Sequence, residues 1–257
     1  MTGRLPAPDD PWQALRRRTA ARIGLGRVGA SLPTAELLRF GLAHAQARDA
    51  VHSALDAAAL AEALQAQGFA TLQVKSMAPD RERYLLRPDL GRSLHADSRT
   101  LLEQAPGADI ALVIADGLSA QAAARHALPV ALLLRAALGG WPAPVIIAQQ
   151  GRVALGDDIG AALGARLSIV MLGERPGLSS PASLGIYLTW NPQRGRMDSE
   201  RNCISNVRPE GLDYQAAAHK LHFLVRQSLL RQLSGVALKD DSAGLAAIAG
   251  SGGTDRL

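Results

Sequence analysis

"LSIVMLGERPGLSSP", residues 167 to 181, is an apolar run that stops at Gly173 and gives way to a charged loop stiffened by proline. The run shows no alternation of apolar and polar residues, which is typical of a strand buried on both faces. Similar runs occur in ADIALVIADG, residues 108 to 117, and PVIIAQQGR, residues 144 to 152, and SLGIYLTW, residues 183 to 190, is a fourth strand candidate. Helical patterns separate the first three runs, so the sequence predicts a parallel sheet covered by helices on both faces.

These runs suggest how the chain is divided. We expect residues 108–240 to form an α/β domain with a Rossmann-like, doubly wound parallel sheet. It is preceded by a mostly helical N-terminal domain over residues 19–107. Residues 1–18 are expected to form an N-terminal arm, and residues 241–257 lack apolar periodicity and are expected to form a disordered tail.

Several elements are expected within the N-terminal region. A helix is predicted from about Thr34, with apolar residues recurring at near-helical spacing, and a second helix is predicted to end at Gly68. FATLQVKS, residues 69–76, has the alternation of a half-exposed strand. RERYLLRPDLGRSL, residues 81–94, is interrupted by proline and glycine and is predicted to be a turn or loop.

Three loops follow the predicted strands: ADGLS, QQGRV and GERPGLSS, at residues 115–119, 149–153 and 173–180. The carboxyl ends of parallel strands lie at one edge of the sheet, and ligands of open α/β sheets bind there. We therefore expect the three loops to converge on a ligand. The alternative, that they are ordinary turns in which Gly, Asp and Ser are common, stays open at this point.

The charge pattern gives little support to a nucleic-acid binder. The formal net charge is +5, and 25 of the 28 basic residues are arginines, because lysine occurs only at positions 75, 220 and 239. The arginines are scattered among acidic residues, which favours solvated side chains over a basic patch, with an anionic cofactor or partner as the alternative. No secretory signal and no membrane-spanning run is recognisable, so we expect a cytoplasmic protein.

Common catalytic motifs are absent or out of context. GLGRVG, residues 24–29, matches G-x-G-x-x-G, but no strand precedes it and Pro33 prevents a helix from following at once. No Walker A sequence, G-x-S-x-G elbow or zinc pattern of histidines is present. Cys203, the single cysteine, lies in a polar stretch before the last helix. There it is either a small buried hydrophobe or, with Arg201 nearby, a reactive thiol, and no histidine stands beside it.

Taken together, these segments resemble the small subunit of ethanolamine ammonia-lyase, with a match from about Trp12 to Asp240. The matching blocks are RRRTAARIGLGRVGASLPTAELLRFGLAHAQARDAV, YLLRPDLGRSL, VIADGLSA, QGRVALGDDIGAALGA, GERPGLSSPASLGIYLTW and RNCISNVRPEGLDYQAAAHKL. So many ordered blocks make the resemblance specific. The N-terminal extension that targets some members to a bacterial microcompartment is not recognisable here, so we expect the cytoplasm, or a microcompartment where one exists.

The resemblance implies an adenosylcobalamin cofactor whose corrin lies between this chain and a large, TIM-barrel subunit. The resemblance assigns three cobalamin contacts of the family to Val153, Glu174 and Cys203 of this chain. No D-x-H-x-x-G motif is present to supply a histidine to cobalt, which is consistent with base-on binding. It assigns no catalytic residue and no metal ligand to this chain.

The implied reaction is that of a carbon–nitrogen lyase in ethanolamine catabolism. Radical chemistry converts ethanolamine to acetaldehyde and ammonia in a hetero-oligomer, and the small subunit is inactive alone. Neither nucleic acid nor membrane is an expected partner. Two rival interpretations remain, a stand-alone nucleotide-binding enzyme and a non-catalytic assembly protein.

Overall fold

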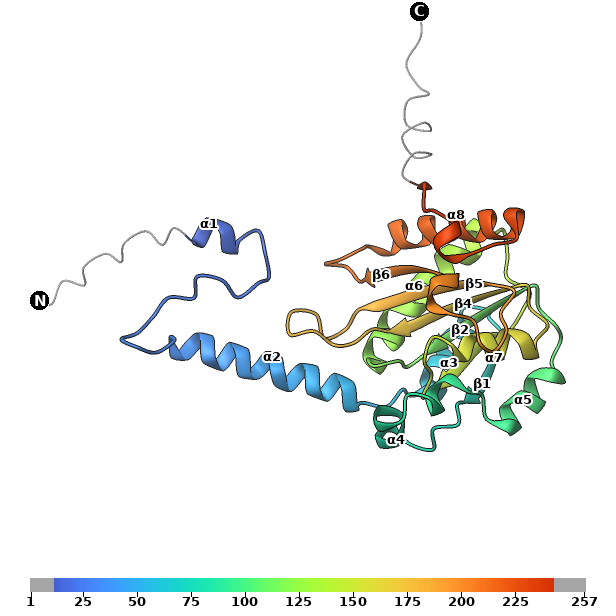
Figure 1. Cartoon of the computed structure of the whole chain (residues 1–257), viewed down its shortest axis with the longest axis horizontal. Coiled ribbons are helices and arrows are strands. Elements are labelled where there is room, and N and C mark those ends of the chain that lie inside the picture. The colour runs from blue at the N-terminus through green and yellow to red at the C-terminus, as the bar shows by residue number, and fades with distance from the viewer. Residues whose placement is uncertain (1–11, 243–257) are drawn as a thin grey trace, which may run out of the picture.

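The computed structural model describes residues 12–242, and these form an α/β fold around one six-stranded sheet, with a helical region at the N-terminal side (Figure 1). The strands are β1 (Thr71–Lys75), β2 (Ile110–Ala115), β3 (Val145–Gln149), β4 (Leu167–Gly173), β5 (Leu184–Trp190) and β6 (Arg201–Val207). The helices are α1 (Gln13–Arg16), α2 (Thr34–His52), α3 (Ala57–Ala66), α4 (Arg81–Leu86), α5 (Ala96–Glu103), α6 (Ala120–Ala137), α7 (Leu155–Ala162) and α8 (Tyr214–Arg231).

The sheet is mixed, with the order β1-β3-β2-β4-β5-β6. The first four strands in this order are parallel, whereas β5 and β6 pair antiparallel. The expectation of an all-parallel sheet is therefore corrected at this end. The physical reason is the connection between β4 and β5, which contains no helix and returns the chain directly beside β4, whereas a parallel neighbour needs a crossover, usually a helix.

Helices cover both faces of the sheet. Helices α3, α6 and α8 pack on one face around a large apolar core, and α5 and α7 pack on the other around a smaller one. Every residue of β4 is buried, as its apolar sequence predicts, and β2 is buried except at Ile110. On the second face α7 lies against β2 and β4, and Cys203 of the edge strand β6 is exposed.

Two segments differ from the expected elements. Residues 201–207 form β6 rather than a loop, because pairing with β5 satisfies the backbone of a stretch that is too polar to be recognised as a buried strand. Residues 81–86 form α4, whose first turn is capped by the Asp80 carboxylate accepting a hydrogen bond from the Arg83 amide (2.8 Å).

The predicted boundary at residues 107/108 runs through one sheet. β1 lies on the N-terminal side of this boundary, yet it pairs in parallel with β3 along its whole length. Leu60 and Leu64 of α3 belong to the same buried cluster as residues of β2 and β3. The backbone of β1 needs a neighbouring strand, and that neighbour comes from beyond the boundary.

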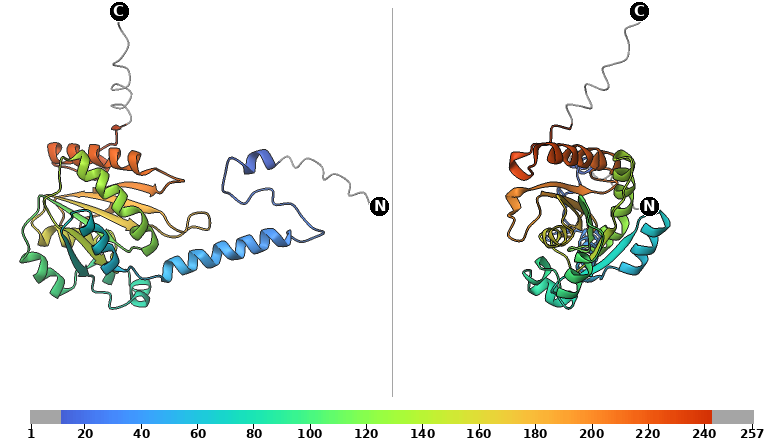
Figure 2. Two further views of the ribbon diagram at one scale, coloured as in Figure 1. Left: turned by 180° about the vertical axis from the view of Figure 1, so that it is seen from behind. Right: turned by 90° about the vertical axis from the view of Figure 1, so that its right-hand side faces the viewer.

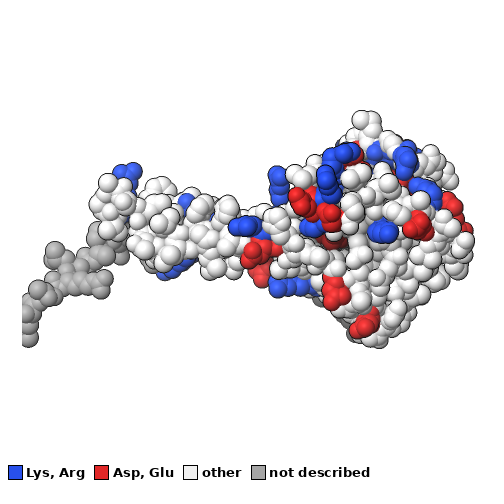
Figure 3. All heavy atoms as spheres, turned by 90° about the horizontal axis from the view of Figure 1, so that it is seen from below, with Lys and Arg blue, Asp and Glu red and all other residues white. Residues whose placement is uncertain are grey.

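Helix α2 and the segment before it extend away from the sheet (Figures 1 and 2). Leu37, Leu38 and Leu42 are 58%, 67% and 60% exposed, so the apolar periodicity of this helix is not used to build the core of this chain. Few charged side chains cover the face of α2 seen from below (Figure 3). Such a helix is typical of a surface that another protein covers.

No helix within residues 12–242 has the length and apolar character needed to cross a membrane. The predicted arm at residues 1–18 is described only from residue 12 onward. The predicted tail is described only to Ser242, and the remainder of both segments lies outside the described residues.

Candidate functional site at the carboxyl edge of the sheet

The three loops that follow β2, β3 and β4 meet at one edge of the sheet, as predicted. The carboxylate of Asp116, directly after β2, accepts hydrogen bonds from the backbone amides of Gln150 (3.0 Å) and Gly151 (2.9 Å) in the loop after β3. The Leu118 amide donates to the Gly173 carbonyl at the end of β4 (2.9 Å). These bonds hold the three strand ends together around a shared edge.

The loop after β2 approaches the end of β4 so closely that only glycine fits. Gly117 has a φ of +56°, and a Cβ added to it would lie 2.2 Å from the Gly173 carbonyl oxygen. Both the backbone conformation and the contact exclude a larger residue. The glycine after the first apolar run thus positions the loop at this edge.

A hollow of about 460 Å³ opens where these loops meet. Val153 and Glu174, two of the three residues expected to contact a ligand, both line it. Their neighbours are Leu118, Leu172, Tyr84, Tyr187, Arg92, Arg152 and Arg175, with Ala154, Gly173 and Asp198. Apolar surface, two phenol rings and several guanidinium groups therefore share one cavity.

The Glu174 side chain is held in place by hydrogen bonds to other residues of this chain. Its carboxylate accepts hydrogen bonds from the Ser183 hydroxyl (2.6 Å) and from the Asn206 amide (3.2 and 3.3 Å to the two oxygens). It lies across Gly185 of β5, where an added Cβ would be 3.2 Å from Glu174 Cγ and Oε1. A carboxylate has about four acceptor positions, so Glu174 retains capacity for a ligand.

Cys203 lies on strand β6 and not in a loop, and its cross-strand partner is Tyr187 of β5, which lines the hollow. Desolvation by the surrounding protein raises the pKa of the Cys203 thiol, the Tyr187 side chain lowers it, and Glu174 raises it, with a net rise. The thiol is therefore neutral at pH 7, which argues against a reactive thiolate. Arg201 does not activate it, because its guanidinium makes two hydrogen bonds with the buried Asp157 carboxylate (2.6 and 2.7 Å).

The sequence did not single out the arginines around Tyr84. Two guanidinium groups lie over the buried Tyr84 ring, with Arg81 Cζ 4.8 Å and Arg152 Cζ 4.5 Å from the ring centroid. Its hydroxyl donates to the Gly151 carbonyl (3.0 Å). Burial, followed by the charge of Asp116, raises the pKa of Tyr84 to about 12, so it stays a neutral donor. Arg152 directly precedes Val153, and this adjacency was the one signal that could have revealed it.

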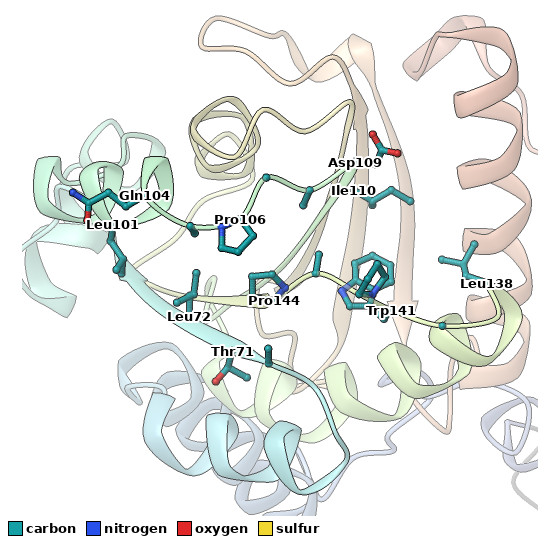
Figure 4. A pocket seen from close by; sticks show the side chains of 17 residues that line it. Thr71, Leu72, Leu101, Gln104, Pro106, Asp109, Ile110, Leu138, Trp141 and Pro144 are labelled. Atoms are coloured by element: carbon teal, nitrogen blue, oxygen red, sulfur yellow. The ribbon is translucent and has the colours of Figure 1, made fainter.

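A larger hollow, of about 910 Å³, lies at the opposite edge of the sheet. Its side chains come from the starts of β1 and β2, the loop before β3 and the end of α5 (Figure 4). The lining is mainly apolar, with Asp109 as the one charged side chain. Open α/β sheets bind ligands at the carboxyl ends of strands, so the smaller, more polar hollow is the stronger candidate site.

Within residues 12–242, no group of three or more His, Cys, Asp or Glu side chains is arranged to bind a metal ion. The hollow at the carboxyl edge therefore offers contacts for an organic group, with apolar, donor and acceptor side chains, and no ligand set for a bare ion.

Comparison with known proteins establishes the family. A family model described as ethanolamine ammonia-lyase light chain (EutC) matches residues 9–239. The chain belongs to this family. It is 55% identical over 250 residues to the ethanolamine ammonia-lyase small subunit of Azotobacter vinelandii, covering 94% of this chain and 93% of the relative. It is 58% identical over 241 residues to the small subunit of Ralstonia nicotianae, covering 90% and 88%.

Membership in this family makes the chain a small subunit of a lyase of ethanolamine catabolism, and a small subunit implies a large partner subunit. The resemblance found in the sequence blocks is thereby confirmed. The match to the family model extends through both the sheet and the projecting helix α2, since residues 9–239 include both.

Proposed function

We propose that this chain, together with a large subunit, converts ethanolamine to acetaldehyde and ammonia, with adenosylcobalamin bound base-on between the two subunits. The observation that carries the proposal is the shared position of Val153 and Glu174 in one hollow, beside the exposed face of Cys203. The family resemblance had selected these three residues as cobalamin contacts from three separate loops of the sequence. Two of them, Val153 and Glu174, line the same hollow, and Cys203 pairs across the strands with Tyr187, which lines it too.

The chemistry of the hollow fits a corrin. Val153 and Leu172 offer apolar contact to a flat macrocycle, and the Glu174 carboxylate is an acceptor for peripheral amide groups. Arg152 Nε is buried and has no hydrogen-bond partner among the described residues. Because protein atoms cover this nitrogen, a ligand in the hollow would meet another part of the Arg152 side chain, which lines the cavity.

In the proposed enzyme the bound cofactor supplies the radical chemistry, and the protein supplies binding and enclosure. This chain's share is to hold the group. Val153 excludes water by apolar contact, Glu174 accepts hydrogen bonds, and Cys203 remains a neutral thiol beside Tyr187. The resemblance assigns ethanolamine binding and catalysis to a TIM-barrel large subunit, so this chain alone is a carbon–nitrogen lyase component without a catalytic residue. It further supports a location in the cytoplasm, or in a microcompartment where one exists.

The projecting helix supports the proposed partnership. The base of α2 is fastened to the site edge by Arg81, whose guanidinium donates to the Val51 carbonyl (2.8 Å) and to the Gly117 carbonyl (2.8 Å). The segment before α2 also touches the loop between β4 and β5, where Arg22 donates to the Leu178 carbonyl (3.4 Å). A subunit that covers the hollow is thus positioned to cover the exposed leucines of α2 as well.

Reconstitution tests the proposal. We expect the purified chain to show no turnover of ethanolamine with added adenosylcobalamin, because the resemblance assigns the substrate site to the large subunit. Co-expression with the large subunit should restore turnover and give a complex whose absorbance spectrum changes on addition of cobalamin. Turnover by the chain alone would contradict the subunit assignment. An active complex that requires a nucleotide in place of cobalamin would favour the rival nucleotide-binding enzyme, and an inactive complex that binds no cobalamin would favour an assembly protein.

Glu174→Ala should weaken cobalamin binding by the assembled complex by about tenfold to hundredfold, since a hydrogen bond to a charged group contributes about 1.5–3 kcal/mol. The matched control is Ser183→Ala, which removes the hydrogen bond that holds Glu174 but keeps its charge. Cofactor titration measures the affinity, and circular dichroism confirms folding. A folded, assembled Glu174→Ala complex with unchanged affinity would show that Glu174 only fastens β6 to the neighbouring loop.

A further inference from the structure

Three arginines line the hollow at the carboxyl edge without a carboxylate partner. Arg92, Arg152 and Arg175 take part in no ion pair with any residue in the described range 12–242. The acids of the hollow are Glu174, which is bonded to Ser183 and Asn206, and Asp198, whose carboxylate lies 3.5 Å from Arg201 Nε. The cavity holds three guanidinium groups and two carboxylates, and both carboxylates already interact with other residues. The cavity therefore has an excess of positive charge.

Arg152 is the most firmly positioned of the three. Its guanidinium stacks on the Tyr84 ring, and its Nη2 donates to the Tyr84 carbonyl (3.2 Å). Its backbone amide donates to the Gly91 carbonyl (2.8 Å), which fixes the start of the side chain as well. An arginine held in this way loses little conformational entropy when it binds a ligand.

The two arginines over the Tyr84 ring differ in whether a carboxylate balances their positive charge. Arg81 is paired with the buried carboxylate of Asp116 (3.2 Å) and donates to two carbonyls. Arg152 has no acid, and its buried Nε lacks any acceptor within residues 12–242. Two guanidinium groups on one ring with a single counter-charge create a site that favours an additional anion.

We propose that Arg152 binds a phosphate-class anionic group of the ligand that fills this hollow, with Arg92 and Arg175 adding weaker, solvent-screened attraction. Guanidinium groups bind phosphate oxygens through paired hydrogen bonds in a fixed geometry. The inference rests on the proposed function for the identity of the ligand. In cobalamin the matching group is the phosphodiester that links the corrin side chain to the benzimidazole nucleotide.

Two probes, one with and one without the nucleotide that carries this group, provide the test. Cyanocobalamin carries the phosphodiester together with the ribose and benzimidazole, and dicyanocobinamide has the corrin without all three. Each is titrated by absorbance into the assembled complex of the unaltered chain and into Arg152→Gln. We expect Arg152→Gln to weaken cyanocobalamin binding by about tenfold to hundredfold and to change dicyanocobinamide binding by less than about twofold.

Two further variants separate charge from size. Arg152→Lys keeps the positive charge and should recover part of the cyanocobalamin affinity, whereas the uncharged Arg152→Met should not. If dicyanocobinamide binds the unaltered complex too weakly to titrate, the difference between Arg152→Lys and Arg152→Met tests the phosphate contact instead. Circular dichroism and size-exclusion chromatography confirm that each variant folds and assembles.

The outcomes distinguish this inference from the proposed function. If the unaltered complex binds neither probe, the cofactor assignment is wrong and this inference falls with it. If the unaltered complex binds cyanocobalamin but Arg152→Gln weakens both probes equally, or neither, the phosphate contact is wrong while the cofactor role stands. Equal affinity of Arg152→Lys and Arg152→Met for cyanocobalamin would likewise overturn it.

Discussion

Arg201→Ala is expected to lower the free energy of unfolding by about 3–5 kcal/mol, the range measured when one partner of a buried ion pair is removed. Arg201 and Asp157 are 3% and 2% exposed at their side chains. Arg201 also donates to the Thr189 hydroxyl (3.1 Å) and the Arg196 carbonyl (2.8 Å), so its removal leaves several buried groups unpaired. Burial lowers the pKa of Arg201, but the hydrogen bond and charge of Asp157 raise it by more, so the guanidinium stays protonated. Burial raises the pKa of Asp157, and the hydrogen bond and charge of Arg201 oppose that rise.

Urea unfolding of the full chain, followed by far-ultraviolet circular dichroism, measures this effect. The double variant Arg201→Met with Asp157→Leu removes both charges and should recover at least half of the loss, because the uncompensated carboxylate is gone. A single variant whose stability changes by less than about 1 kcal/mol would contradict the expectation, since that is the range of an exposed pair.

Asp116→Ala is expected to cost about 3–5 kcal/mol of stability as well, because it leaves the guanidinium of Arg81 without its counter-charge. Asp116 is 1% exposed, and its loss also frees the amides of Gln150 and Gly151. The loop that carries Val153 should then become mobile, so affinity for the proposed cobalamin should fall together with stability. This joint loss separates Asp116 from Arg201, whose side chain does not line the hollow and should affect stability first.

The matched control for Asp116 is Asp89→Ala. Asp89 pairs with Arg87 at 2.7 Å, but both side chains are 58% exposed. The control should leave the unfolding midpoint and the cofactor affinity nearly unchanged. An Asp116 variant that behaves like the Asp89 variant would show that the loop after β3 is held by other contacts.

Much of the sheet could be predicted because strand burial leaves a local pattern. The uninterrupted apolar runs of residues 110–115 and 167–173 match β2 and β4. The edge strand β6 could not be predicted, since RNCISNV has no uniform apolar character and its place depends on pairing with β5. The apolar spacing in α2 correctly indicated a helix, but it did not reveal that the leucines face outward.

The candidate site divides in the same way. The strand-end positions of Val153 and Glu174 followed from the sequence, because parallel strands end at one edge. The Arg81–Tyr84–Arg152 stack did not, because Tyr84 lies 67 residues from the Gly151 carbonyl that its hydroxyl contacts. No local pattern records which of the many arginines meets an acid and which does not.

By itself, the sequence determined the buried strands of the sheet, most of its helices, the shared edge of the three loops and the family. Each of these follows from a pattern over neighbouring residues or from ordered blocks along the chain. Only the tertiary structure decided the direction of β5 and β6, the burial of Arg201 against Asp157, and the unpaired state of Arg152. These depend on groups far apart in the chain, such as Asp157 and Arg201, which are 44 positions apart, and their free energies arise only when the folded chain removes both from water.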